Sequence, residues 1–282
     1  MTQKIAVMIL HGAGTPERQF AEEMMERITK SFVKKTGASP TELVFEPVFW
    51  SSIFAGGQEE LWENFQSDNL HFQRLRKFAV EFLADAVAYQ PTDKDGQNYD
   101  QVHTLLAKSI RKLKERAGER APLCVISHSL GSIVASNYFF DLQYRREKIG
   151  VETRLATSKT PIEQCETLTL FYTMGSPMAL WSMRYIDFGS PIMVPSPELP
   201  VHYPDLKGEW LNFYDKDDVL SYPLKNINEA YNRAVTRDVS VNAGGMLTSW
   251  NPISHIKYDT DKEVISSIVN GLCRTWKTIN ND

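Results

Sequence analysis

A serine lies between two apolar runs, in a short stretch of small and polar residues. Residues 125–134 read VISHSLGSIV, with small residues two positions before and two positions after Ser129. Those residues, Ser127 and Gly131, allow the chain to turn sharply from a strand into a helix, which raises the central hydroxyl above the sheet. The free N–H groups of the helix N-terminus favour negative charge beside it. We therefore predict that Ser129 is a nucleophile; the alternative is a buried serine that only caps the helix.

A serine hydroxyl is a poor nucleophile unless a base takes its proton, so a histidine and a carboxylate are expected later in the chain. His255 ends the polar sequence NPISH just before the last predicted helix, and we predict that it is the base. The sequence YDKDDV follows a predicted strand, at the end where the active sites of open α/β sheets lie. It offers three candidate acids, Asp215, Asp217 and Asp218. We predict no metal site here, because no further ligands lie nearby in the sequence.

The tetrahedral intermediate of acyl transfer also needs N–H donors for its oxyanion. The backbone N–H of Leu130, directly after the serine, is one candidate. The sequence HGAG at 11–14 follows the first predicted strand, and its glycines let backbone N–H groups approach a substrate closely. We predict that Ala13 supplies the second donor, with His11 and Gly12 as supporting residues that shape the loop.

A sheet must bring these loops to one edge. Apolar segments predict six strands, at residues 5–10, 43–50, 123–126, 168–174, 210–214 and 238–242. Helices are predicted at residues 15–37, 58–89, 98–117, 131–142 and 260–279. This alternation predicts an α/β fold, in which helices flank a mainly parallel central sheet.

With these motifs in order, the chain resembles the α/β-hydrolases of the lipase and serine esterase type. The resemblance is carried by HG at 11–12, SHSLG at 127–131, Asp-X-Val at 217–219 and SHxxY at 254–258. It spans nearly the whole chain and begins at the third strand of the family, so the first hairpin is missing. It implies the α/β-hydrolase fold, a Ser-His-Asp triad and ester hydrolysis.

The resemblance also bears on the choice of acid. In this family the acid is typically followed two residues later by an aliphatic residue, and Val219 has this position relative to Asp217. We therefore predict Asp217, with Asp215 and Asp218 as alternatives. One departure is Ser127, where the family most commonly has glycine.

Length and composition favour a single domain over residues 1–282, with an insertion at 178–209 that is rich in proline and aromatic residues. We predict that this insertion is a cap or lid over the site; a plain structural excursion is the alternative. The net charge is −4, and no dense block of lysine and arginine indicates nucleic-acid binding. The three cysteines are far apart, which indicates neither a disulfide framework nor a zinc site.

The apolar run near the N-terminus is too short to span a membrane and lacks a signal-peptide cleavage site, so we predict a cytoplasmic protein. We predict a serine hydrolase that cleaves a small-molecule carboxylic ester through an acyl-enzyme, without a cofactor. A thioesterase or a phospholipid acyl-hydrolase would use the same residues, and a non-catalytic binding module is an alternative from another class. Binding to a membrane surface is not indicated but stays open, as does the oligomeric state.

Overall fold

The computed structural model describes residues 2–14, 17, 19–66, 71, 73–91, 97–243, 255 and 257–280. In this part of the chain six strands form one sheet in the order β2-β1-β3-β4-β5-β6, and all neighbouring strands are parallel. The strands are β1 (Ile5–Leu10), β2 (Leu43–Val48), β3 (Leu123–His128), β4 (Leu168–Met174), β5 (Glu209–Asp215) and β6 (Arg237–Val241). The predicted α/β fold with a mainly parallel sheet of about six strands is confirmed.

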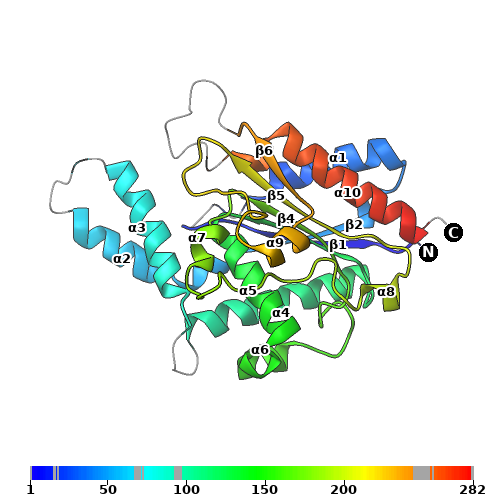
Figure 1. Ribbon diagram of the computed structural model, residues 1–282, viewed down its shortest axis with the longest axis horizontal. Helices are drawn as coiled ribbons and strands as arrows, with labels where there is room; N and C mark the ends of the chain where they lie inside the picture. Colours follow the sequence, from blue (N-terminus) through cyan, green and yellow to red (C-terminus); the bar gives the residue numbers. More distant parts are fainter. Residues whose placement is uncertain are drawn as a thin grey trace.

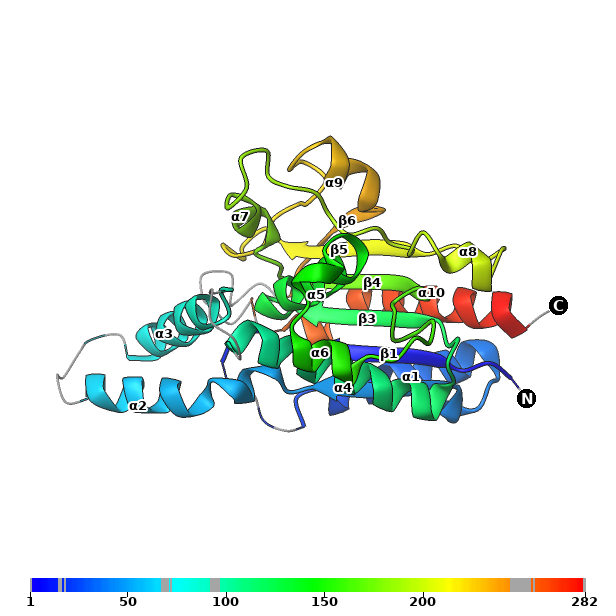
Figure 2. The same cartoon turned by 90° about the horizontal axis from the view of Figure 1, so that it is seen from below.

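Helices cover both faces of this sheet. They are α1 (Glu22–Thr36), α2 (Ala55–Gln66), α3 (Gln73–Ala88), α4 (Asn98–Ala117), α5 (Leu130–Tyr144), α6 (Val151–Ala156), α7 (Met178–Ser182), α8 (Leu199–His202), α9 (Glu229–Ala234) and α10 (Lys262–Asn280). Figure 1 shows α1 and α10 on one face, and α4, α5 and α6 on the other. In Figure 1 and Figure 2, α2 and α3 extend away from the sheet. None of the described helices is long and apolar enough to cross a membrane.

The strand β1 is apolar on both faces, so helices must cover it on both sides of the sheet. All six of its side chains are buried, as the continuous apolar sequence IAVMIL predicts. Because side chains alternate along a strand, Ile5 and Val7 pack into the core beneath α1 and α10, while Ala6 and Met8 pack into the core on the opposite face. Burial on both faces makes β1 a central strand, and its carboxyl end leads into the HGAG loop.

The helix α1 buries Met24, Ile28 and Phe32, which recur every four residues along one face. It ends where predicted, because Gly37 has a φ of 72° and donates its N–H to the carbonyl of Val33. Its beginning differs from the prediction: α1 starts at Glu22, and residues 15–16 of the expected start lie outside the described residues.

Two further segments differ in detail from the sequence prediction. The single helical region expected at 58–89 forms two helices, α2 and α3, and residues 67–70 and 72 between them lie outside the described residues. The segment 178–209 contains the short helices α7 and α8 and irregular backbone up to Glu209, which begins β5. In this segment Ser196 donates its N–H to the carbonyl of Leu168 of β4 at 2.8 Å. This segment is thus hydrogen bonded to the sheet.

Candidate active site

The chain turns sharply at Ser129, between the end of β3 and the start of α5. Ser129 has a φ of 49° and a ψ of −128°, and its N–H donates to the carbonyl of Met174 on β4 at 2.8 Å. A positive φ is costly for a residue with a side chain, and such strain gathers at functional sites. A strand, a sharp turn at the serine and a helix follow one another as the sequence predicts.

The small residues on either side of Ser129 are required by close contacts. A Cβ atom on Gly131 would lie 2.2 Å from the carbonyl oxygen of His11, a distance that no side chain can occupy. Ser127 is fully buried and its hydroxyl donates to the carbonyl of Tyr172 at 3.2 Å. The loop after β1 therefore lies directly against this turn.

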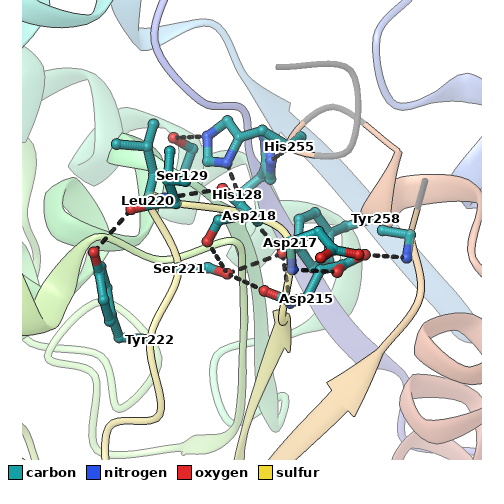
Figure 3. A network of polar contacts seen from close by, with 12 residues as sticks. His128, Ser129, Asp215, Asp217, Asp218, Leu220, Ser221, Tyr222, His255 and Tyr258 are labelled. Atoms are coloured by element: carbon teal, nitrogen blue, oxygen red, sulfur yellow. Dashed lines mark hydrogen bonds and ion pairs between the residues drawn. The ribbon is translucent and has the colours of Figure 1, made fainter. Parts of the chain in front are cut away.

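His255 connects Ser129 to a carboxylate, although the three residues are far apart in the sequence. Its Nε2 lies 2.6 Å from the Ser129 Oγ, and its Nδ1 lies 2.8 Å from the Asp218 Oδ2 (Figure 3). All three residues are buried, with at most 5% of any of them exposed. With the Nδ1 proton donated to Asp218, Nε2 presents its lone pair to the serine hydroxyl, which is the geometry needed for proton transfer.

The carboxylate beside His255 belongs to Asp218, which corrects the prediction of Asp217 as the acid. The side chain of Asp217 is exposed, and its N–H donates to the Asp215 Oδ1 at 2.9 Å. Asp215 also accepts the N–H of Ala243 at 2.7 Å, so it orders the turn after β5. The aliphatic residue expected two positions later could not separate the candidates, because Leu220 follows Asp218 just as Val219 follows Asp217.

Asp218 has three hydrogen-bond donors around its carboxylate. Besides His255, the Tyr258 Oη donates to Oδ2 at 2.8 Å and the N–H of Leu220 donates to Oδ1 at 3.0 Å (Figure 3). Burial alone would raise the pKa of Asp218, but the hydrogen bonds from His255, Leu220 and Tyr258 outweigh it and lower the pKa below its usual value. The carboxylate is therefore ionised at neutral pH and able to stabilise a protonated His255.

The loop predicted to supply the second oxyanion donor lies beside the nucleophile. A Cβ atom on Gly12 would lie 2.9 Å from the Ser129 Cβ, so only glycine allows this approach. Ala13 and Ser129 line the same cavity. Leu130 is the first residue of α5, so its N–H has no acceptor within the helix. Leu130 directly follows Ser129 and Ala13 lines the same cavity, so both stay the predicted oxyanion donors.

His11 is held in a neutral form inside this loop. Its Nδ1 donates to the carbonyl of Gly12 at 2.7 Å, and its ring stacks on Trp50 with the centroids 5.2 Å apart. Burial lowers the pKa of His11 to about 4. The Trp50 Nε1 in turn donates to the His11 carbonyl at 2.8 Å. These contacts agree with a residue that shapes the loop.

His128 has a contact that sequence reasoning missed. Strand alternation indicates a side chain pointing away from Ser129, yet its ring lines the cavity and its Nε2 donates to the carbonyl of His255 at 2.5 Å. Burial, together with the nearby His255, lowers the pKa of His128 to about 3, so the ring is neutral. No local pattern could have shown this contact, because His255 lies 127 positions along the chain.

A cavity of about 250 Å³ opens beside Ser129, on the side of the sheet covered by α1. Its apolar wall is formed by Ile9, Phe20, Ala21, Met24 and Met174. No residue of the segment 178–209, all of which is described, lines this cavity. Among the described residues, no group of three or more histidine, cysteine, aspartate or glutamate side chains could hold a metal ion.

No family model matches the chain, and no curated protein matches its sequence. Solved structures similar to the chain include a fungal esterase from Rhizomucor miehei, with a TM-score of 0.48 and 12% identity over 99% of this chain and 77% of that one. A dienelactone hydrolase from Anabaena variabilis has a TM-score of 0.38 and 12% identity over 99% and 87% of the two chains. A Pyrobaculum calidifontis esterase has a TM-score of 0.40 and 12% identity over 96% and 76%. The case for a function therefore rests on the side chains around Ser129.

Proposed function

We propose that this protein is a serine hydrolase that cleaves carboxylic esters through an acyl-enzyme. The observation that carries the proposal is the continuous set of contacts from Ser129 through His255 to Asp218, at 2.6 Å and 2.8 Å. A buried serine that only capped α5 would need neither the positive φ nor a histidine on its hydroxyl. The Ser129 side chain in fact makes no capping hydrogen bond to the helix.

The reaction follows from these positions. The Ser129 Oγ attacks the ester carbonyl while the His255 Nε2 takes its proton, and Asp218 holds the required tautomer and stabilises the imidazolium. The N–H groups of Leu130 and Ala13 donate to the oxyanion as charge develops on the former carbonyl oxygen. The alcohol leaves with the proton from His255. A water molecule then attacks the acyl group with His255 as base, which releases the acid and restores Ser129.

The cavity supports an apolar acyl group. Its wall from Ile9, Phe20 and Met24 is apolar, and the nearby histidines His11 and His128 are neutral at pH 7. The acidic side chain among its described lining residues is Asp259, which would repel an anionic acyl group. Burying an apolar chain there is favourable by about 25 cal/mol for each Å² removed from water. We therefore expect substrates with a hydrocarbon acyl chain rather than a charged one.

The test is hydrolysis of p-nitrophenyl esters with acyl chains from acetate to palmitate, by the wild type and by Ser129→Ala. We expect turnover that depends on Ser129 and rises with chain length until the cavity is filled. A fluorophosphonate probe should label the wild type and leave Ser129→Ala unlabelled. A folded wild type with no Ser129-dependent turnover of any oxygen ester would reject the proposal. Matched thioester and phospholipid substrates show whether another acyl donor is preferred.

A further inference from the structure

A buried carboxylate from α3 reaches the loop that carries the predicted oxyanion donor. Asp85 lies near the C-terminal end of α3 and is 0% exposed. Its Oδ2 accepts the N–H of Gly14 at 2.7 Å, although the two residues are 71 positions apart. Gly14 ends the HGAG sequence and directly follows Ala13. No motif in the sequence singles out Asp85, and the mechanism above does not use it.

Both polar backbone groups of Gly14 are held from outside the loop. Asp85 accepts its N–H, and the Ser51 hydroxyl donates to its carbonyl at 2.7 Å. Gly14 has a φ of 86°, a conformation that residues with side chains rarely adopt. Removing a carboxylate from water is costly unless it is hydrogen bonded, so a fully buried Asp85 favours the conformation in which this contact is made.

We propose that Asp85 is a positioning residue for the oxyanion hole: by anchoring Gly14 it holds the N–H of Ala13 where the oxyanion forms. The inference rests on the proposed function, since it concerns the same site. Through Asp85, the helix α3 would hold the HGAG loop in position, although α3 is one of the two helices that extend away from the sheet in Figure 1.

The contact matters because oxyanion donors act only when they are already in place. A donor must lie about 2.7–3.1 Å from the position of the oxyanion, and losing one donor costs about 10²–10³-fold in kcat. The HGAG loop contains two glycines, so its backbone has more conformational freedom than most loops. Without Asp85 the Ala13 N–H would be present but poorly aligned. We expect a loss of about 10- to 100-fold in kcat, smaller than the loss of the donor itself.

The experiment compares wild type, Asp85→Asn, Asp85→Ala and Glu163→Gln with a p-nitrophenyl ester. Glu163 is a matched control, because it is also a fully buried carboxylate but is paired with Lys114 at 2.9 Å and does not line the cavity. Asp85→Asn keeps an oxygen that can accept the Gly14 N–H, so it should lose less activity than Asp85→Ala. The KM should stay within about threefold, since the donors act on the transition state rather than on the bound ester.

Binding of an alkyl boronic acid separates positioning from a general loss of structure. It forms a tetrahedral adduct on the serine, so its affinity should fall in parallel with kcat in the two Asp85 variants and stay unchanged in Glu163→Gln. Folded Asp85 variants with the kcat and boronate affinity of the control would overturn the inference alone. It is also overturned if neither variant folds, since Asp85 would then serve folding. A wild type without Ser129-dependent turnover would reject the proposed function and this inference together.

Discussion

Replacing two neighbouring aspartates one at a time tests which of them acts on His255. Asp218 and Asp217 are adjacent, but only Asp218 is buried, and its Oδ2 lies 2.8 Å from the His255 Nδ1. Replacing either with asparagine changes one atom and one charge at nearly the same place in the chain. The two variants are therefore matched controls for each other.

In Asp218→Asn the amide cannot satisfy all three donors that surround the carboxylate. If its NH₂ replaces Oδ2, it faces the Nδ1 of His255 and the hydroxyl of Tyr258, and His255 is driven to the tautomer that cannot accept the serine proton. If its NH₂ replaces Oδ1, it faces the N–H of Leu220 and the negative charge is lost as well. Removing the acid of such a triad lowers kcat about 10³- to 10⁴-fold, or about 4–5.5 kcal/mol of transition-state stabilisation.

The assay is kcat and KM for p-nitrophenyl butyrate, with folding checked by circular dichroism. We expect Asp217→Asn to stay within about twofold of wild type, because an exposed side chain contributes little. The reasoning is refuted if Asp217→Asn loses as much activity as Asp218→Asn, or if a folded Asp218→Asn keeps more than a tenth of the wild-type kcat.

Three further changes have definite expected results. His128→Phe removes the donor to the His255 carbonyl, and at about 1 kcal/mol for a hydrogen bond we expect kcat to fall about fivefold with little change in melting temperature; unchanged kcat would contradict a positioning role. Gly131→Ala places a Cβ 2.2 Å from the His11 carbonyl oxygen, so wild-type activity and melting temperature in this variant would contradict the close approach. Burial lowers the pKa of His11 to about 4 and the pKa values of His103 and His128 to about 3, whereas the same histidines in the unfolded chain are protonated near pH 6.5. The stability they contribute is therefore full above about pH 6.5 and is lost as the pH falls toward the folded values, by about 1.4 kcal/mol per pH unit for each histidine. Urea unfolding between pH 7 and pH 5 measures this slope, and a flat profile would contradict it.

The parts of the fold that follow a local pattern could be predicted from the sequence. The run IAVMIL identifies a strand buried on both faces, and the four-residue spacing in α1 identifies its buried face. The turn at Ser129 could be recognised from a local pattern, the small residues two positions before and after it, although the contact that requires Gly131 is with the His11 carbonyl in the loop after β1. Parallel strands bring the loops after β1, β3 and β5 to the same edge of the sheet, so the approximate meeting place of the site residues also follows from the strand prediction.

The choice between neighbouring carboxylates could not be made from the sequence. Which side chain of the turn after β5 points inward depends on Asp215, whose carboxylate accepts the N–H of Asp217 and that of Ala243. The second of these contacts joins segments 28 positions apart. The contact between Asp85 and Gly14 is likewise set by how α3 packs against the loop after β1, and no spacing of residue types indicates it.

The neutral histidines around Ser129 give the site its charge balance. His128 lies with its ring centroid 5.0 Å from that of His255, so a proton on His128 would oppose the imidazolium of the proposed mechanism. Burial prevents this by lowering the pKa of His128 to about 3, and burial lowers the pKa of His11 to about 4. Asp218 keeps its negative charge through its three hydrogen bonds. In the proposed mechanism the proton leaving Ser129 at neutral pH would therefore arrive next to the buried Asp218 carboxylate and two uncharged rings, an arrangement that favours its transfer to His255.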